Sequence, residues 1–468
     1  MAGTYKAYPE YKESGVEWLG EIPSGWVVLN SRRMFGQRKE RARKEDKQLT
    51  ASQKYGVIFQ KEFMEREGQR VVQVLTGSEI LKHVEPDDFV ISMRSFQGGL
   101  EWCKYAGSVS SAYVGLIPIK HVAPEFFSYL FKSKPYIQAL QSTSNLVRDG
   151  QALRFDNFSL IALPVLSLPE QQQIARFLDH ETAKIDRLIE RQERLIGLLE
   201  EKRQAVISHA VTKGLNPDAP LRPSGIDWLG DMPEHWDVSK FSYAKTVLTD
   251  YTANGSFADL KKNVTYLDEP SYARLIRLTD LRKGLKNDNG VWIDKASYTY
   301  LKKSSLLGGE FLLANVGAYA GLFYEMPENA GHASLAPNMF MAKFDEAMLH
   351  RKFIAYVSQG TAVNSQLVLA ATASSAQPKL NKEDFKSVLF AYPCKLEQKE
   401  IVNFLDNTLK THDLLITKAQ SAIDLLKERR TALISAAVTG KIDVRDWEPP
   451  KDSFQPPEES ASLTRVSA

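Results

Sequence analysis

Apolar residues recur along two long stretches of the chain at alternating spacings of four and three residues. The first stretch covers residues 174–206 and the second covers residues 401–433. This spacing is typical of the apolar seam of a coiled coil, in which one helix packs against another. Pro169 suits the start of the first helix, and Gly214 and Gly440 suit the ends of the two helices.

The two apolar stripes match in length and register, so we expect the helices to pair with each other as an antiparallel coiled coil. The alternative is that each helix packs only on its own globular region. The polar residues Asp179, Glu181 and Thr182 predict a break between a short helix and a longer one over 182–212. The longer helix would measure roughly 45 Å at 1.5 Å per residue.

Short apolar runs of the β type dominate two other regions, residues 50–120 and 260–345. Runs such as VVQVL and EFLLANV alternate there with turn signals rich in Gly, Pro, Asn and Asp. Helical patterns follow, over 124–140 and 346–360. This order predicts an α+β globular domain that occurs twice. The polar, proline-rich tail 447–468 is expected to be disordered.

The chain contains a long internal repeat. Residues 14–28 (SGVEWLGEIPSGWVV) match residues 224–238 (SGIDWLGDMPEHWDV), and both segments carry two tryptophans. Residues 170–212 match residues 397–439, which begin with EQQQIARFLD and EQKEIVNFLD. The chain is therefore two copies of one unit, each a globular part followed by a helical part. Because the sequence between these anchors has diverged, we expect one scaffold whose loops contact different targets.

The composition excludes several classes of protein. Of 468 residues, 43% are hydrophobic and 25% are charged, which excludes a wholly disordered or collagen-like chain. Cys103 and Cys394 could form at most one bridge, which excludes a disulfide scaffold. Without an apolar leader or a run of 18 apolar residues, the chain is expected to be cytoplasmic and to lack a membrane span. The 60 basic and 57 acidic residues do not by themselves indicate a nucleic-acid partner.

Known catalytic motifs are missing from the sequence. It has neither a G-x-x-x-x-G-K-[ST] phosphate loop nor a G-x-G-x-x-G fingerprint, and its 8 histidines show no zinc spacing. Asp87, Glu101 and Lys104 fit the loose P-D…E-x-K pattern of magnesium-dependent nucleases. The repeat argues against a nuclease, because Asp87 lies opposite Gly309 and Glu101 opposite Phe323. We therefore expect no catalytic residues and no metal site in this chain.

Basic and amide side chains cluster where they could contact nucleic acid, although a solvated surface is the alternative for each. Residues 32–47 hold eight basic and three acidic residues, and cations near a phosphate backbone release condensed counterions. Arg and Gln can also make bidentate contacts to base edges. The candidates in the first copy are Arg38, Lys39, Arg41, Arg43, Arg94, Gln97, Lys104, Arg148 and Arg154. The candidates in the second copy are Lys302, Lys303, Asn315, Tyr319 and Lys379.

Three motifs together resemble the specificity subunit of Type I restriction–modification enzymes. They are the opening SGVEWLGEIPSGW, the run LPVLSLPEQQQIARFLD over 163–179, and the ending EKRQAVISHAVTKG over 201–214. The resemblance covers the chain apart from its tail. It implies two target-recognition domains, joined by two antiparallel helices, that read a bipartite double-stranded DNA sequence with a non-specific gap.

The resemblance also implies partner proteins. Two modification subunits that methylate adenine, together with restriction subunits that supply motor and nuclease activity, would join the chain in a prokaryotic cytoplasm. S-adenosylmethionine, ATP and magnesium are expected in those subunits and not in this chain. The modification subunits would dock on the helical region, where the apolar candidates are Leu188, Leu195, Leu199, Leu415, Leu426 and Leu433.

The predicted fold class is α+β, with two pseudo-repeated globular recognition domains separated by two long helices that pair as an antiparallel coiled coil. The recognition domains are expected over 1–165 and 217–392, the helical regions over 166–216 and 393–446, and the disordered tail over 447–468. Two other functions are weighed against a DNA-specificity subunit. One is a stand-alone magnesium-dependent DNA nuclease, and the other is a coiled-coil assembly protein that binds no DNA.

Overall fold

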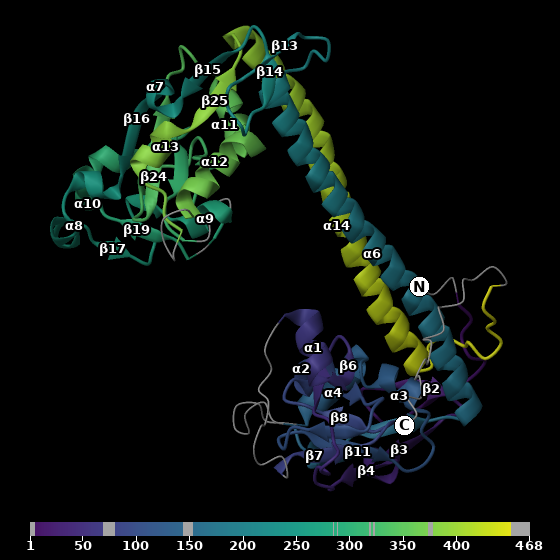
Figure 1. Cartoon of the computed structure of the whole chain (residues 1–468). Coiled ribbons are helices and arrows are strands. Elements are labelled where there is room, and N and C mark those ends of the chain that lie inside the picture. Colours follow the sequence, from purple (N-terminus) through teal and green to yellow (C-terminus); the bar gives the residue numbers. More distant parts are fainter. Residues whose placement is uncertain are drawn as a thin grey trace, which may run out of the picture. The chain divides into compact units, whose positions relative to one another are not determined.

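Each half of the chain builds the same frame of antiparallel strands (Figure 1). The computed structural model describes residues 5–68, 80–143, 153–283, 285–287, 289–317, 320–321, 323–372 and 378–450. The chain divides into two compact units: unit 1 is Met1–Gln192 with Ser421–Ala468, and unit 2 is Glu193–Gln420. Each unit therefore contains one globular domain and a stretch of both long helices.

The central four-stranded sheet has the same topology in both units. Its order is β4-β11-β8-β9 in unit 1 and β16-β24-β21-β22 in unit 2, and all neighbours are antiparallel. The unit 1 strands are β4 (Phe35–Arg38), β8 (Phe89–Ile91), β9 (Glu101–Trp102) and β11 (Val114–Pro118). The unit 2 strands are β16 (Lys245–Asp250), β21 (Phe311–Ala314), β22 (Phe323–Glu325) and β24 (Met339–Phe344). The predicted duplication is confirmed at the level of the fold.

Three smaller strand pairs also recur. Unit 1 pairs β1 (Tyr11–Glu13) with β2 (Glu21–Pro23), β3 (Val27–Asn30) with β12 (Ala162–Val165), and β7 (Lys82–Val84) with β10 (Gly107–Val109). Unit 2 pairs β13 (Leu221–Pro223) with β14 (Asp231–Pro233), β15 (Asp237–Lys240) with β25 (Leu389–Tyr392), and β20 (Ser305–Leu306) with β23 (Ala333–Leu335). The β3–β12 and β15–β25 pairs bring the beginning and the end of each globular domain together.

The units differ in the segment between the first and second central strands along the chain. Unit 1 has a hairpin of β5 (Leu49–Ser52) and β6 (Gly56–Phe59), followed by α1 (Gln60–Glu67). Unit 2 instead extends the β20–β23 pair with β18 (Ala273–Ile276), β19 (Val291–Ile293) and β17 (Tyr266–Leu267). These strands add two further apolar clusters to unit 2. The shared frame therefore carries different insertions, as the diverged sequence predicts.

Short helices complete both domains. In unit 1 they are η1 (Ser31–Arg33), α2 (Ser95–Gly98), α3 (Pro124–Leu130), α4 (Lys134–Ser142) and α5 (Phe155–Ser159). In unit 2 they are α7 (Phe241–Ala244), η3 (Tyr251–Asn254), α8 (Phe257–Asn263), α9 (Leu278–Arg282), α10 (Lys295–Tyr300), η4 (Lys302–Ser304), α11 (Arg351–Gln359), α12 (Thr361–Thr372) and α13 (Lys382–Ser387). No helix in the described part of the chain is both long and apolar enough to cross a membrane.

An aromatic residue stands at the centre of each globular core. Phe35 in unit 1 and Phe241 in unit 2 each contact four other aromatic rings at centroid distances of 6.1 Å or less. Both residues are completely buried. Edge-to-face and tilted packing of this kind adds to the free energy gained from apolar burial. Each unit therefore has its own core.

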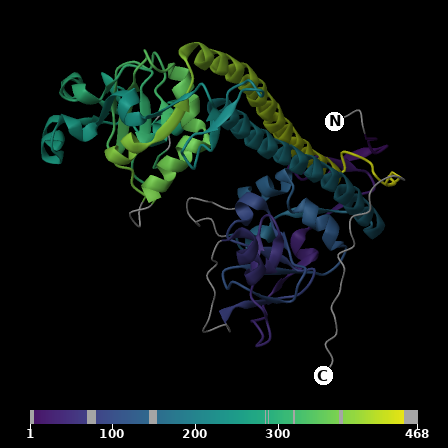
Figure 2. The same ribbon diagram turned by 45° about the horizontal axis from the view of Figure 1, so that its top comes forward.

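Two long helices, α6 (Leu168–Lys213) and α14 (Lys395–Val438), run side by side in both views (Figures 1 and 2). In unit 1, Arg430 Nε donates to Asp186 at 2.9 Å. In unit 2, Arg203 Nε lies 3.7 Å from Asp413. Residue numbers rise along one helix as they fall along the other, so the predicted antiparallel pairing is confirmed. The two ion pairs are formed by equivalent residues of the repeat.

Two details of the helix prediction are wrong. α6 is a single helix of 46 residues, and it continues through Thr182 because that hydroxyl donates to the carbonyl of Leu178 at 2.6 Å. The buried seam also runs through Ile189 rather than Leu188, which is 38% exposed. In the same way Leu195 is 43% exposed, while the next residue, Ile196, is partly buried.

The repeated motifs fasten each long helix to its globular domain. In unit 1, Trp26 Nε1 donates to Glu170 at 3.0 Å. The buried Gln171 accepts from the N–H of Ala123 at 2.8 Å and donates to the carbonyl of His121 at 3.0 Å. The equivalent residues of unit 2 form the same bonds: Trp236 to Glu397, His350 N–H to Gln398, and Gln398 to Met348.

The segment after α14 returns to the first strands of unit 1. The N–H of Asp443 donates to the carbonyl of Lys6 at 2.7 Å. Trp447 packs edge-on against Phe177, with ring centroids 5.3 Å apart. A disordered tail beginning at residue 447 is therefore wrong for Trp447, because the indole is held by this aromatic contact. Residues 451–468 lie outside the described part of the chain.

Candidate nucleic-acid interface

Arg38, the first basic candidate, is engaged inside unit 1. Its Nε and Nη2 donate to the two carboxylate oxygens of Asp88 at 2.5 and 3.0 Å. Asp88 is only 1% exposed, and burial raises the pKa of its carboxyl although the Arg38 hydrogen bonds act in the opposite direction. Loss of Arg38 would leave a buried carboxylate unpaired, so this arginine stabilises the sheet.

Unit 2 keeps a buried carboxylate at the same place in the frame. Glu310, the counterpart of Asp88, is 1% exposed and lies 3.1 Å from Lys343. It accepts from the N–H groups of Leu307 and Gly308 at 3.0 and 2.8 Å, as Asp88 accepts from a backbone N–H in unit 1. The cation comes from β24 in unit 2 and from β4 in unit 1. The charge pair is kept although its residues have changed.

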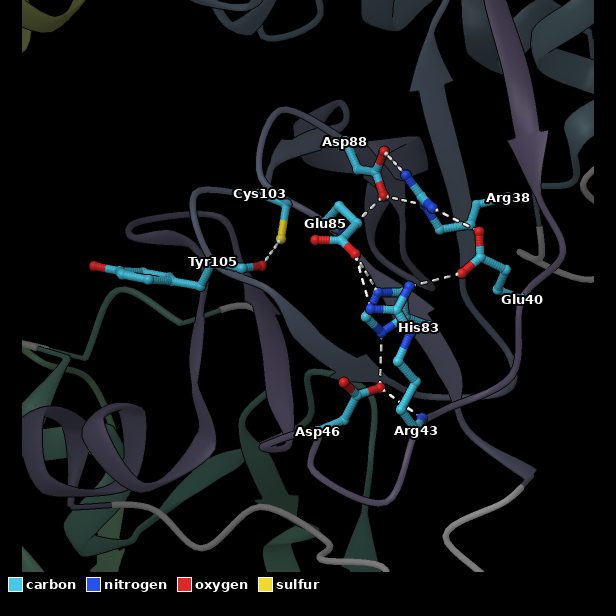
Figure 3. A network of polar contacts seen from close by, with 9 residues as sticks. All are labelled: Arg38, Glu40, Arg43, Asp46, His83, Glu85, Asp88, Cys103 and Tyr105. Carbon is cyan, nitrogen blue, oxygen red and sulfur yellow. Dashed lines mark hydrogen bonds and ion pairs between the residues drawn. The ribbon is translucent and has the colours of Figure 1, made fainter.

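A network of charged side chains fixes the segment rich in basic residues, 32–47, to β7 (Figure 3). His83 is 1% exposed, and its Nδ1 and Nε2 lie 2.8 Å from Asp46 and Glu85, respectively. Because both partners are carboxylate oxygens, both ring nitrogens donate and the imidazole is cationic. Burial lowers the pKa of His83, but the hydrogen bonds to Glu85 and Asp46 outweigh it, and the net pKa is raised above its usual value.

We expect the imidazolium of His83 to stabilise unit 1 most strongly at low pH. The folded-state pKa is raised from 6.5, so its contribution is complete below that pH and is lost as the pH rises through the raised value. His83→Gln cannot carry this charge. It should lack this pH-dependent part of the stability and be less stable at pH 6 by roughly 1–3 kcal/mol.

Thermal unfolding followed by circular dichroism between about pH 6 and pH 9 measures this effect. His209→Gln is the control, because His209 is an exposed histidine of unit 2. It should follow the wild-type pH dependence. An unchanged pH dependence in His83→Gln would contradict a cationic His83.

Among the four binding candidates of this segment, Lys39 and Arg41 stay available to a ligand. Both are exposed, and neither forms an ion pair with another described residue. Arg43, in contrast, pairs with Glu40 and Glu85 at 3.1 Å each. The polar network around His83 thus holds Lys39 and Arg41 on a fixed backbone, an arrangement that suits contact with phosphate groups.

The glycine turn after α2 places several candidates together. Gly99 has φ +79°, and a Cβ there would lie 1.9 Å from the carbonyl oxygen of Phe131, so only glycine fits. Arg94, directly before α2, and Gln97, within α2, are exposed. Gln53 Nε2 donates to the carbonyl of Arg94 at 3.4 Å. The β5–β6 turn therefore lies directly beside the predicted recognition turn.

A cavity of about 400 Å³ opens in this region of unit 1, and we call it the unit 1 groove. Aromatic faces line it together with cations: Tyr55, Trp102, Tyr105, Tyr129, Lys54, Arg66, Lys104, Lys132 and Arg430. Most of these cations are already paired; Lys132, for example, contacts both oxygens of the buried Glu101 at 2.6 Å. Lys104 has no carboxylate partner among the described residues and lies 5.0 Å from the Trp102 ring centroid. The groove thus offers stacking faces and hydrogen-bond donors more than net charge.

Sequence reasoning missed most of the unit 1 groove. Gln53, Lys54 and Tyr55 form the β5–β6 turn, and Arg66 lies on α1. The only local signal was a polar–aromatic turn, Gln-Lys-Tyr-Gly, between two short apolar runs. That signal marks a hairpin but does not tell what the hairpin faces.

The three residues of the nuclease alternative do not converge. Glu101 and Trp102 are neighbours on β9, so their side chains point to opposite faces of the sheet. Asp87 accepts from Trp102 Nε1 at 3.2 Å, which places it away from Glu101. Within the described ranges no group of three His, Cys, Asp or Glu side chains is suited to hold a metal ion. The geometry therefore gives no support to a magnesium-dependent nuclease.

In unit 2 the structure brings Asn315 and Lys379 together. The N–H of Leu380 donates to the carbonyl of Asn315 at 2.9 Å, and the neighbouring Val316 forms a β-bridge with Lys379. The side-chain oxygen of Asn315 is buried without a hydrogen-bond partner in the described part of the unit. Lys302 and Lys303 belong to a different element, η4, where Lys303 Nζ donates to the carbonyl of Ala253 at 3.1 Å.

The remaining candidates stay predictions. Arg154 is exposed at the start of α5, where its N–H donates to the side chain of Asn157 at 3.0 Å. Arg148 and Tyr319 lie outside the described residues.

The six helical leucines fall into two groups. Leu199 and Leu433 are 8% and 2% exposed, and Leu426 packs against the unit 1 core, so these three hold the helices in place. Leu188, Leu195 and Leu415 are exposed, and so are two leucines that sequence reasoning did not single out, Leu198 and Leu425. Leu188 is the repeat counterpart of Leu415, and Leu198 is the counterpart of Leu425. Each unit therefore exposes one leucine of each pair.

The duplicated frame, with its paired helices and diverged loops, matches one protein family in both copies. The model of the Type I restriction modification DNA specificity domain matches residues 23–196 and 260–423. These matches define the class of protein, a duplicated DNA-specificity protein. The chain belongs to this family, and the predicted resemblance is confirmed.

Named relatives and a solved structure agree with this assignment. The chain is 23% identical over 371 residues to the Type I restriction enzyme StySPI specificity subunit of Salmonella potsdam, covering 77% of this chain and 75% of the relative. It is also 23% identical over 372 residues to the EcoKI specificity subunit of Escherichia coli strain K12, with the same coverage. A solved structure described as showing complex assembly and conformational transition of the type I R-M system has a TM-score of 0.65 at 14% identity, covering 90% of this chain and 99% of that one. The relatives are named as specificity subunits, in agreement with the prediction of a non-catalytic subunit.

Proposed function

We propose that the chain reads a bipartite double-stranded DNA target, one half with each unit, and holds the subunits that modify and cut DNA. The observation that carries this proposal is the duplicated frame with different insertions. Both units repeat the same central sheet, whereas the β5–β6 hairpin of unit 1 is replaced in unit 2 by three extra strands. A constant frame with variable loops is the arrangement expected for two readers of different sequences.

In unit 1 the proposed DNA contacts divide into two kinds. Lys39 and Arg41 would contact phosphates, because they are exposed cations on a segment fixed by buried ion pairs. Arg94, Gln97 and Lys104 would contact base edges, because they lie beside the unit 1 groove. In unit 2 the corresponding contacts would come from Asn315, Lys379, Lys302 and Lys303.

The helical region would hold two modification subunits. Leu188 in unit 1 and its counterpart Leu415 in unit 2 are 38% and 43% exposed, and both lie outside the seam of the helix pair. Exposed apolar residues at equivalent positions suit two copies of the same partner. We call the exposed faces around Leu188 and Leu415 the unit 1 and unit 2 docking faces. Restriction subunits would join this assembly in the prokaryotic cytoplasm, and S-adenosylmethionine, ATP and magnesium would be bound by the partner subunits.

The proposal is tested by expressing the chain with its modification subunits and mapping the methylated adenines. We expect one motif made of two defined half-sites separated by a spacer without sequence preference. A continuous motif would contradict two independent readers. Methylation that does not depend on this chain would favour the coiled-coil assembly protein without DNA binding.

A further inference from the structure

One phenylalanine of the repeat is buried in unit 1 and exposed in unit 2. Phe177 on α6 is completely buried in unit 1. Its repeat counterpart on α14, Phe404, is 43% exposed in unit 2. The surrounding motif is otherwise shared, since FLD follows the same helix start in both copies. An apolar site that is filled in one copy is therefore open in the other.

In unit 1 residues from both ends of the chain cover Phe177. Tyr5 and Trp447 pack edge-on against Phe177, each with ring centroids 5.3 Å away. Gln173, one helical turn before Phe177, donates to the backbone carbonyls of Val444 and Trp447 at 3.1 and 2.5 Å. The covering segment is thus recognised by an aromatic side chain and by an amide donor.

Unit 2 lacks residues that would cover Phe404 as Tyr5 and Trp447 cover Phe177. Leu215 stands where the repeat places Tyr5, and it is itself 39% exposed. The chain leads from α6 into β13 here, so no segment like 440–447 follows. Glu400 replaces Gln173, is exposed, and forms no ion pair with another described residue of unit 2. A carboxylate accepts hydrogen bonds and attracts cations, whereas the amide of Gln173 donates to carbonyls.

Phe404 and the unit 2 docking face lie on the same side of α14. Phe404 precedes Leu415 by 11 residues, close to three helical turns, so the two side chains lie on the same face of α14. In unit 1 the exposed apolar side chains on the corresponding face begin at Leu188, because Phe177 is covered. The exposed apolar positions on this face therefore reach about 16 Å further in unit 2, with Thr408 and Thr411 between Phe404 and Leu415.

We propose that the site formed by Phe404 and Glu400 anchors the modification subunit that docks on unit 2, through an aromatic side chain next to a lysine or arginine. The aromatic ring would pack on Phe404 as Trp447 packs on Phe177, and the cation would pair with Glu400. This inference rests on the proposed function and adds that the two docking faces are not equivalent. The unit 1 face has no such anchor, because this chain fills the equivalent site itself.

The test is titration of the full-length chain with the purified modification subunit, followed by calorimetry and native mass spectrometry. Wild-type chain should bind two copies. Phe404→Ala should weaken one of the two binding steps about tenfold to a hundredfold, as expected for the loss of an aromatic anchor. Glu400→Lys should weaken the same step, and Glu400→Gln should weaken it less.

Two variants serve as controls. Phe257→Ala removes another exposed ring of unit 2, which is 73% exposed, and should leave both steps unchanged. Trp447→Ala should leave the step sensitive to Phe404 unchanged, because it alters only the covered site. Thermal unfolding of Phe404→Ala should match wild type, since an exposed side chain adds little to stability.

The inference is overturned if Phe404→Ala binds both copies with wild-type affinity, or if it weakens both steps equally. In either case wild-type chain still binds two modification subunits, and the proposed function stands. If wild-type chain binds no modification subunit, the proposed scaffolding function fails and the inference fails with it.

Discussion

Replacing residues 31–160 by the corresponding region of a relative is expected to change one half of the DNA target completely and to leave the other half as it was. The ends of this region lie just inside the β3–β12 pair, in which Asn30 faces Ala162 and Val27 faces Val165. This pair stays in place and holds the two junctions together. The exchanged region carries the central sheet, the His83 network and the β5–β6 hairpin of unit 1.

The long helices should accept a new domain that keeps the apolar residues of the shared core, because their hydrogen bonds to it include backbone groups. Gln171 binds the N–H of Ala123 and the carbonyl of His121, which any sequence provides. The side-chain contact from Tyr129 to Asp179, at 2.6 Å, recurs in unit 2 as Tyr356 to Asp406 at 2.6 Å. A donor that keeps this tyrosine is therefore preferred.

Mapping the methylated adenines of cells that carry the exchanged chain measures this outcome. The matched control exchanges residues 241–388, which lie inside the equivalent β15–β25 pair, and should change the other half-site. Two independent readers would be contradicted if a single exchange altered both halves. Retention of the complete original motif would contradict DNA reading by unit 1.

Inserting seven residues into both long helices is expected to lengthen the non-specific spacer while both half-sites stay the same. Seven residues are close to two helical turns, so the buried seam keeps its phase. They add about 10 Å, which corresponds to at most about three base pairs at 3.4 Å each. The insertions belong after residue 194 in α6 and after residue 421 in α14, between the two ion pairs that fix the register.

The antiparallel pairing makes an unmatched insertion the informative control. A seven-residue insertion in α6 alone shifts one side of the pair by about 10 Å. It therefore cannot keep both Asp186–Arg430 and Arg203–Asp413 in register, and we expect a clear loss of thermal stability and of methylation. An active variant with matched insertions that keeps the original spacer would show that the helices do not set this distance.

The repeated motifs were sufficient to predict the duplication and the family, and the two matching apolar stripes predicted the antiparallel helix pair. These features are visible in the sequence because they depend on local periodicity and on residues that bind the same partners in both copies. Trp26 and Trp236, for example, each donate to the glutamate that begins the EQQ or EQK motif. A contact of this kind restricts both of its residues, so both are kept in each copy.

The phase of the helix seam could not be read from the sequence. Ile185 and Leu199 can be joined at four-three spacing through Leu188 and Leu195 or through Ile189 and Ile196. The two patterns have the same period, so periodicity cannot distinguish them. Only the packing of α6 against α14 and the globular cores partly buries Ile189 and Ile196 and leaves Leu188 and Leu195 exposed.

Tertiary structure alone also decided which candidate cations are free. In the sequence Arg38, Lys39, Arg41 and Arg43 form one basic run. The fold brings Asp88, which directly precedes β8, against Arg38 from 50 residues away, and Glu85 against Arg43, while Lys39 and Arg41 stay exposed. A charge run shows how many cations a segment has, but the partners of those cations come from distant parts of the chain. The same physical reason explains why Phe177 is buried and Phe404 is exposed, since the residues that cover Phe177 come from the two ends of the chain.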